Sequence, residues 1–158
     1  NKLEKFVLNG GIPLRGEVSI SGAKNAVVAI LPATILAQDV CVIENIPNIS
    51  DVYYMTKILE QLGARIKRLS KSTLEIDTKG VNSYVVSHDM TKHLRASYYF
   101  IGALLGRFHR AKVAMPGGCN FGVRPIDQHI KGFTTMGAEV SVEGGFIHTA
   151  AKNGRLTG

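Results

Sequence analysis

Two segments of the chain carry apolar residues at helical spacing, and a short apolar stretch follows each of them. The first segment covers residues 23–37 and is followed by the stretch at 41–44, whereas the second covers residues 91–107 and is followed by the stretch at 112–115. Apolar positions three and four residues apart place one face of a helix against a core, and short apolar runs between polar residues are typical of strands. The pattern therefore predicts two helix–strand pairs.

A second helix is predicted after each of these strands. Ser50 or Asp51 can cap the first of the two, and Pro125 can open the other, because proline is tolerated in the first turn of a helix. The apolar stripes of these helices would consist of Val52, Met55, Leu59 and Leu62 in the first and of Ile130, Phe133 and Met136 in the second.

The ends of these two helices reveal an internal repeat. Gln61-Leu62-Gly63-Ala64-Arg65-Ile66 recurs as Thr135-Met136-Gly137-Ala138-Glu139-Val140. The glycine in each copy can end the helix in the left-handed conformation. A two-stranded piece then follows, over 65–69 with 74–77 in the first copy and over 139–142 with 146–149 in the second, where Gly144-Gly145 would form the turn.

The repeat predicts the fold class and the domain organisation. We expect an α+β fold of α/β-type repeats, with one β-α-β-α-β-β unit in residues 21–85 and a second in residues 86–158. Residues 1–20 precede the units and contain two strand patterns, over 6–9 and 15–19. The second copy is longer between its strand and its second helix, and the extra residues fall in the glycine-rich loop 117–122. A loop that lengthens in one copy of a repeat indicates a function at that place.

This loop and the helix start after it hold the most reactive side chains of the chain. Residues 115–129 read MPGGCNFGVRPIDQH, with Cys119 among glycines, Arg124 after it, and Asp127 and His129 at the expected helix start. Backbone N–H groups at a helix start, together with a nearby guanidinium, attract anions and favour a thiolate. The pattern favours an enzyme that handles a phosphorylated substrate, and an inert loop cysteine is the alternative.

The charge of the chain agrees with acidic partners. Its 158 residues include 19 Lys and Arg against 12 Asp and Glu, a formal charge of +7. Nucleic acid, anionic lipid and phosphorylated small molecules would all fit such a balance. The densest basic cluster, Arg65, Lys67, Arg68 and Lys71, alternates with apolar residues and is typical of the solvated face of an edge strand. We therefore expect a small-molecule substrate and no nucleic-acid partner.

The cysteines and histidines predict neither a disulfide nor a metal site. Cys41 lies in an apolar strand pattern and is expected to be buried and structural, and no second Cys or His lies at ligand spacing from Cys119. The longest apolar run, residues 26–37, contains Pro32 and is too short to span a bilayer. No signal peptide opens the chain, so we expect a cytoplasmic protein with no membrane partner.

Four separated motifs carry a resemblance to a known family. They are Gly22-Ala23-Lys24-Asn25-Ala26, Leu94-Arg95-Ala96-Ser97, Pro116-Gly117-Gly118-Cys119 and Arg124-Pro125-Ile126-Asp127-Gln128-His129. Their order and the repeat resemble the enolpyruvyl transferase family, in the branch that uses UDP-N-acetylglucosamine. Gln128 stands where this branch commonly has leucine. Because the backbone is expected to contact the nucleotide there, we expect this difference to change little.

The resemblance implies a fold larger than this chain. Members of the family have two domains, each of three β-α-β-α-β-β units around a pseudo-threefold axis, with the active site between the domains. Residues 1–20 would belong to the other domain, and the chain would hold two of the three units of the first domain. We accordingly expect the end at Gly158 to be a cut in a longer protein and the fragment alone to be inactive.

The resemblance also implies the reaction. The enolpyruvyl group of phosphoenolpyruvate moves to the 3-hydroxyl of UDP-N-acetylglucosamine and phosphate leaves, which is the first committed step of peptidoglycan synthesis. The path is addition through a tetrahedral intermediate followed by elimination. No cofactor and no metal are implied. The base for the acceptor hydroxyl would come from the missing part of the enzyme.

Roles for single residues follow from the same resemblance. Cys119 would be the general acid, would add covalently to phosphoenolpyruvate and would be alkylated by fosfomycin. Lys24 and Arg124 would bind phosphoenolpyruvate and Asn25 the sugar. The nucleotide site would consist of Arg95, Arg124, Pro125, Ile126, Asp127 and Gln128, with His129 facing the same entrance. From local sequence alone, Lys24 and Arg95 could equally be ordinary charges near helix starts.

Three other functions stay open at this point. A 5-enolpyruvylshikimate-3-phosphate synthase has the same fold, but it lacks the Pro-Gly-Gly-Cys loop. A fragment that binds a UDP-sugar without catalysis would need only the nucleotide residues. A redox protein would oxidise Cys119 reversibly, although no resolving cysteine lies near it in the sequence.

Overall fold

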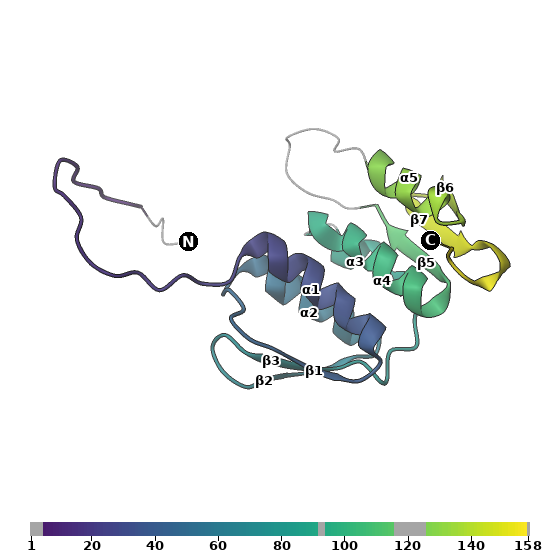
Figure 1. The fold of residues 1–158 in the computed structure, drawn as a ribbon, viewed down its shortest axis with the longest axis horizontal. Coiled ribbons are helices and arrows are strands. Elements are labelled where there is room, and N and C mark those ends of the chain that lie inside the picture. The colour runs from purple at the N-terminus through teal and green to yellow at the C-terminus, as the bar shows by residue number, and fades with distance from the viewer. Residues whose placement is uncertain (1–4, 92–93, 116–125, 158) are drawn as a thin grey trace.

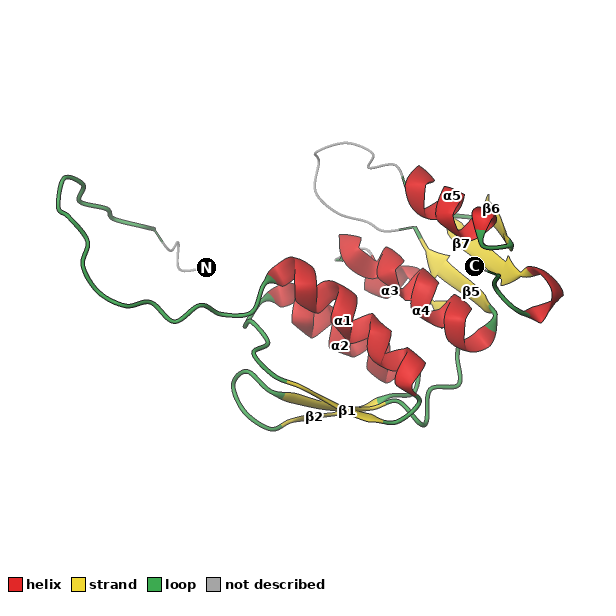
Figure 2. Cartoon of the chain, in the orientation of Figure 1, coloured by secondary structure: helices red, strands yellow, loops and turns green. Residues whose placement is uncertain are grey.

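The computed structural model describes residues 5–91, 94–115 and 126–157 (Figure 1). The helices over residues 24–37, 50–61 and 99–108 pack in the middle, and one sheet lies on each outer side (Figure 2). The elements of the first half are α1 (Lys24–Ala37), β1 (Val40–Ile43), α2 (Ser50–Gln61), β2 (Arg65–Arg68) and β3 (Leu74–Asp77).

The second half adds a strand before its first helix and two short 3₁₀ helices. Its elements are β4 (Val85–Val86), α3 (His88–Thr91), η1 (Arg95–Tyr98), α4 (Tyr99–Phe108), β5 (Arg110–Ala114), α5 (Asp127–Thr135), β6 (Ala138–Glu143), β7 (Phe146–Ala151) and η2 (Lys152–Gly154). The order of strands and helices from β4 to β7 follows the predicted β-α-β-α-β-β pattern.

The two sheets have related topologies. The first has the order β1-β3-β2 with antiparallel pairs, and the second has the order β4-β5-β7-β6, in which β4 and β5 are parallel and the other pairs antiparallel. The β6–β7 hairpin turns at Gly144 and Gly145, whose φ angles of 57° and 78° suit glycine at both central positions of a tight turn. This turn confirms the predicted hairpin, and the predicted edge position of β2 is confirmed as well.

The core lies between α1, α2 and α4 and the inner faces of the two sheets. The predicted stripe of α2 is buried, with Met55 and Leu59 at 0% exposure. Helices α1 and α4 approach closely at Gly106, where a Cβ would lie 2.8 Å from Leu36 Cδ2. The stripe of α5 is only half-buried, because this helix packs over one edge of the core, with Phe133 against Gly102 of α4.

The strands predicted over residues 6–9 and 15–19 do not form, so this prediction is wrong. No helix or strand occurs from residue 5 to residue 23, and Figure 1 shows this segment running away from the body of the molecule. Apolar side chains at its even positions, such as Leu8 (87% exposed) and Leu14 (96% exposed), face solvent. A strand needs a neighbour to satisfy its N–H and C=O groups, and the described residues provide none here. The assignment of residues 1–20 to another domain stays a prediction.

The long helix predicted over residues 91–107 is divided. It consists of α3, η1 and α4, and Leu94 between α3 and η1 has extended backbone angles (φ −137°, ψ 106°). Leu94 is 1% exposed, so an extended residue directly before η1 is buried in the core. The break places Arg95 at the start of a new helical segment.

Candidate active site

Several helices begin on one side of the molecule. In Figure 1, the N-terminal end of each of α1, α4 and α5 is the end nearer the left of the view, the side on which the N-terminal segment leaves. The N–H groups in the first turn of a helix have no partner within that helix and carry a partial positive charge. A surface formed by several such helix starts favours anionic ligands, and Lys24, Arg95 and Asp127 are the first residues of α1, η1 and α5.

Lys24 is the first residue of α1, and its ammonium group is paired. Its Nζ lies 2.8 Å from Asp51 Oδ1, in the first turn of α2. The Lys24 side chain is 59% exposed and the Asp51 side chain 18% exposed, so the carboxylate is the enclosed partner. An ammonium has three N–H donors, and this contact leaves donors of Lys24 available to a bound anion. Asn25 is exposed beside it.

A close backbone contact brings the starts of α1 and α2 together. The N–H of Gly22 donates to Asn45 Oδ1 at 3.1 Å. A Cβ on Gly22 would collide with the backbone carbonyl oxygen of Asn45, so only glycine fits here. Ile46, the next residue, is 4% exposed and its N–H donates to the Ser72 carbonyl at 2.8 Å. The segment before α2 is therefore held against the turn that leads into Lys24.

Arg95 begins η1 and is half-buried. It lies between two fully enclosed residues, Leu94 at 1% and Ser97 at 0% exposure. The hydroxyl of Ser97 has no hydrogen-bond partner among the described residues. The sequence predicts equivalent positions for Lys24 and Arg95 in the two copies, and this is confirmed. Lys24 is the first residue of α1 and Arg95 the first residue of η1, which leads directly into α4, and α4 packs against α1.

The start of α5 lies next to η1 and α4. The ring of His129 packs edge-to-face on Tyr98, with centroids 4.9 Å apart, and its centroid lies 6.4 Å from that of Tyr99. Ile126 is half-buried against the core, whereas Asp127, Gln128 and His129 are exposed. The structure thus brings His129 and its neighbours to the helical turn that contains Arg95.

Three predicted site residues lie outside the described residues. They are Cys119, Arg124 and Pro125, and the cysteine loop stays a prediction from the sequence. Cys41, the other cysteine, is half-buried on β1 opposite Ile76, not fully buried as expected. Strand β1 is an edge of its sheet, which leaves one side of this strand uncovered.

Two contributors to this region have no signal in the sequence. Asp51 reads as a helix-capping acid, and nothing in its spacing from Lys24 indicates an ion pair. Tyr98 reads as one more apolar position of a long helix, and its contact with His129 depends on how α5 packs. Contacts between elements that are far apart in the chain are set by tertiary packing, which periodicity does not report.

One hollow on the described surface lies elsewhere. It measures about 490 Å³ on the second sheet and is lined by Tyr84, Arg110, Ala111, Lys112, Glu139, Val140, Ser141, His148, Thr149 and Ala150. None of the predicted site residues that the structure describes lines it. The cations there already stack on rings, with the Arg110 guanidinium 4.2 Å from the Tyr84 centroid. We therefore do not take this hollow as the active site.

The described ranges contain neither a candidate metal cluster nor a membrane-spanning helix. In residues 5–91, 94–115 and 126–157, no group of three or more His, Cys, Asp or Glu side chains could hold a metal ion. None of the helices formed by these residues is long and apolar enough to cross a membrane.

The fold is that of an enolpyruvyl transferase. The crystal structure of the enolpyruvyl transferase NikO from Streptomyces tendae matches the chain with a TM-score of 0.74 at 23% sequence identity, over 94% of this chain and 32% of that one. This similarity confirms the predicted α+β class and the enolpyruvyl transferase architecture.

The sequence of the chain specifies its family. Residues 8–158 match the family described as EPSP synthase (3-phosphoshikimate 1-carboxyvinyltransferase). The chain therefore belongs to this family of enolpyruvyl transferases, and the predicted membership in a family of enzymes is confirmed.

Several curated relatives carry the name UDP-N-acetylglucosamine 1-carboxyvinyltransferase. The chain is 56% identical to the one from Clostridium botulinum over 146 residues, which is 92% of this chain and 35% of the relative. It is 51% identical to one from Streptococcus pneumoniae over 156 residues, 99% of this chain and 37% of the relative. The one from Caldanaerobacter subterraneus is also 51% identical, over 95% of this chain and 36% of the relative. The chain thus spans little more than a third of the length of these relatives.

Proposed function

We propose that this chain is part of an enzyme that transfers the enolpyruvyl group of phosphoenolpyruvate to the 3-hydroxyl of UDP-N-acetylglucosamine and releases phosphate. The observation that carries the proposal is the identity of 51–56% to proteins named for this reaction, over nearly the whole chain. Two cations at helix starts, Lys24 and Arg95, support it, because both substrates are anionic.

Lys24 would bind phosphoenolpyruvate. Its ammonium projects from the start of α1, where the first-turn N–H groups add to the positive potential. Arg124 would provide a second cation for the phosphate, with two parallel N–H donors that suit phosphate oxygens. Two cations on one trianionic substrate stabilise the charge that collects on the phosphate as the carbon–oxygen bond breaks.

The nucleotide of the second substrate would lie between η1 and the start of α5. Arg95 would contact its phosphates, and residues 124–128 would bind the uridine part through side chains and the first-turn N–H groups of α5. The ring contact between His129 and Tyr98 supports this assignment, because it holds the two segments side by side. Asn25, exposed beside Lys24, would reach the sugar.

Cys119 would be the general acid. Addition of the acceptor hydroxyl to phosphoenolpyruvate requires a proton at the methylene carbon, and a thiol whose pKa is near neutrality can give that proton and recover it in the elimination step. The same sulfur would form a covalent adduct with phosphoenolpyruvate and would react with the epoxide of fosfomycin. The roles of Cys119 and Arg124 rest on the sequence, since both lie outside the described residues.

In the cell this reaction would commit UDP-N-acetylglucosamine to peptidoglycan synthesis. The enzyme would act in the cytoplasm, without a nucleic-acid or membrane partner, and its loss would affect the cell wall, cell shape and division. The rest of the protein would supply the base for the acceptor hydroxyl and further contacts to both substrates. Residues 1–158 alone should therefore bind weakly at most and show no turnover.

The test is phosphate release from phosphoenolpyruvate by the full-length protein with UDP-N-acetylglucosamine as acceptor. Release should require the UDP-sugar and should fall to background in Cys119→Ala. Cys41→Ala is the matched control, because Cys41 lies half-buried on β1 and has no proposed role. The proposal is wrong if wild-type protein shows no release with the UDP-sugar. Full activity of Cys119→Ala would remove the cysteine from the mechanism and leave the reaction in place.

A second acceptor is favoured by one observation. The matching family is described by its action on 3-phosphoshikimate, so shikimate 3-phosphate is the alternative acceptor. It should be assayed beside the UDP-sugar at the same enzyme concentration. Release with shikimate 3-phosphate alone would replace the proposed substrate and keep the enolpyruvyl transfer.

A further inference from the structure

We propose that Asp51 is a positioning residue, which holds the Lys24 ammonium where phosphoenolpyruvate binds. The inference rests on the proposed function and adds a residue to it. Asp51 belongs to none of the motifs that carry the family resemblance. It contacts Lys24 directly, from a different helix, with Nζ and Oδ1 2.8 Å apart.

The two partners are unequally enclosed. The Asp51 side chain is 18% exposed and the Lys24 side chain 59% exposed. Asp51 precedes Val52, which is 3% exposed in the core, so packing of α2 fixes the backbone that carries the carboxylate. The carboxylate is therefore the fixed partner, and the lysine, with its four-carbon stem, is the side chain that gains order from the contact.

The backbone around the pair is built to keep it in place. The Gly22 N–H bonds Asn45 Oδ1, and the bare Cα of Gly22 lies against the Asn45 carbonyl. These contacts join the residue two positions before Lys24 to the segment that leads into α2. These contacts couple the start of α1 to the segment that precedes α2 and so help to hold Lys24 and Asp51 close together.

A lysine that is held by one carboxylate can still bind an anion. One of its three N–H donors points to Asp51, and the others are open to a phosphate or carboxylate oxygen. Without Asp51 the ammonium would sample many rotamers in solvent, and the substrate would have to order it on binding. Small errors in the position of a catalytic group lower rates strongly.

A simpler role for Asp51 does not involve Lys24. Asp51 lies in the first turn of α2, where a negative charge stabilises the helix by itself. That role predicts a loss of stability when the charge is removed, with the same effect whether or not Lys24 is present. The positioning role predicts that the effect on catalysis disappears when Lys24 is absent.

The experiment is a double-mutant cycle in the full-length protein, with Asp51→Asn, Lys24→Met and both together. Asp77→Asn is the matched control. Its carboxylate is 15% exposed and pairs with Arg65 at 2.7 Å, and the next residue, Thr78, bonds the Thr34 carbonyl towards the other end of α1. Readouts are kcat and KM for phosphoenolpyruvate, the KM for the acceptor, and the urea midpoint of unfolding.

We expect Asp51→Asn to lower kcat/KM for phosphoenolpyruvate roughly ten- to a hundredfold, with less than about a twofold change in the acceptor KM. In the Lys24→Met background the same substitution should change kcat/KM less than about twofold. Asp51→Glu should recover part of the loss, and Asp77→Asn should leave kcat/KM within about twofold of wild type. If Asp51→Asn does not fold, Asp51→Ser replaces it in the cycle.

Equal effects of Asp51→Asn in both backgrounds would overturn the inference, as would an Asp51→Asn enzyme that behaves like Asp77→Asn. Either result would leave the proposed function standing, because wild-type turnover with the UDP-sugar is measured in the same assay. Turnover with shikimate 3-phosphate alone would change the acceptor but still allow the cycle for phosphoenolpyruvate. Absence of release with either acceptor would overturn both the function and the inference.

Discussion

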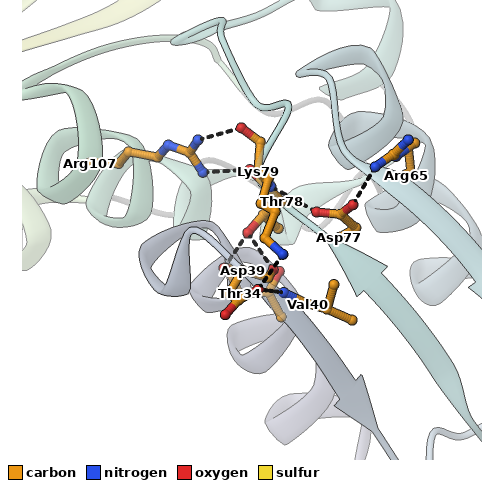
Figure 3. A network of polar contacts seen from close by, with 8 residues as sticks. All are labelled: Thr34, Asp39, Val40, Arg65, Asp77, Thr78, Lys79 and Arg107. Atoms are coloured by element: carbon orange, nitrogen blue, oxygen red, sulfur yellow. Dashed lines mark hydrogen bonds and ion pairs between the residues drawn. The ribbon is translucent and has the colours of Figure 1, made fainter.

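The guanidinium of Arg107 donates a 2.8 Å hydrogen bond to the backbone carbonyl of Thr78, and this contact joins the two halves of the chain (Figure 3). Arg107 lies at the end of α4, and Thr78 follows β3. The same guanidinium donates to the carbonyls of Ile35 at 3.1 Å and Val81 at 2.9 Å. Thr78 is 0% exposed, and its hydroxyl donates to the carbonyls of Thr34 and Asp39. One planar side chain thus satisfies backbone groups at the end of α1 and in the connection between the units.

Replacement of Arg107 by alanine should strongly destabilise the protein. The substitution leaves several enclosed carbonyl groups without a donor, and hydrogen bonds that involve a charged group are the stronger ones. We expect the free energy of unfolding to fall by about 2–4 kcal/mol. Urea denaturation followed by circular dichroism measures this change. Arg107→Lys should recover little of it, because an ammonium cannot reproduce the planar fork of donors.

Arg110→Ala is the control, because it removes another arginine three residues further along the chain. Arg110 is exposed at the start of β5, and its guanidinium stacks on Tyr84. The loss should stay below about 1 kcal/mol, as expected for an exposed cation–ring contact. Similar losses for Arg107→Ala and Arg110→Ala would mean that the carbonyl cluster contributes little to stability.

Gly22→Ala should separate the starts of α1 and α2. The new Cβ would collide with the Asn45 carbonyl oxygen, which is backbone and cannot rotate away. We expect a loss of about 1–3 kcal/mol in the free energy of unfolding, typical of overpacking. Because Lys24 and Asp51 lie at these two helix starts, kcat/KM for phosphoenolpyruvate should fall more than the stability change alone explains. Unchanged stability and activity would contradict the close contact.

Gly132→Ala should raise the free energy of unfolding, in contrast to Gly22→Ala. Gly132 lies inside α5, and a Cβ added there meets no atom within 4 Å. Alanine lowers the conformational entropy of the unfolded chain and has the higher helix propensity, so we expect a gain of about 0.5–1 kcal/mol. The urea midpoint should rise accordingly. A decrease would show that α5 packs against something at this position.

Much of the fold could be predicted because its helices and strands are amphipathic. Helix α2 and strand β3 have the buried faces that apolar spacing predicts, since both lie across the core. The predicted cap of α2 at Ser50 or Asp51 is wrong, because both residues lie inside the helix and its N-cap is Ile49, with no side-chain hydrogen bond. The same reasoning failed for residues 6–9 and 15–19. Their alternation is that of a strand, but a strand also requires a partner, and the pattern says nothing about whether one is present. Likewise, the helical spacing of apolar residues over 91–107 does not indicate that Leu94 has extended backbone angles.

The candidate site was predicted in part for a related reason. Lys24, Arg95 and Asp127 could be placed near helix starts from local sequence, because glycine, proline and polar residues mark such starts. The ion pair of Lys24 with Asp51 could not, since it depends on how two helices pack. The contact of His129 with Tyr98 likewise joins segments that are distant in the chain. Local patterns give candidate residues, and packing decides their partners.

The acid dependence of stability should reflect two carboxylates near Thr78. Hydrogen bonds from Lys79 and from the Val40 N–H hold the pKa of Asp39 below its ordinary value. Hydrogen bonds from Arg65 and from the Lys79 N–H likewise hold the pKa of Asp77 below its ordinary value. The folded state therefore binds fewer protons than the unfolded state as pH falls. The stabilisation is fully present above the unfolded pKa, and it is lost as pH falls through the lower folded pKa.

The double variant Asp39→Asn/Asp77→Asn isolates this contribution. Its free energy of unfolding should lie below that of wild type at pH 7. The difference should begin to close as pH falls below about 4, the ordinary pKa of an aspartate, and should close further as the folded carboxylates become protonated at lower pH. Urea denaturation between pH 7 and pH 3 measures both curves, and Glu44→Gln corrects for the loss of an exposed negative charge. High salt should reduce the difference at pH 7, because both side chains of the Asp39–Lys79 pair are exposed. Parallel curves from pH 7 to pH 3 would show that the two carboxylates are not stabilised in the folded state.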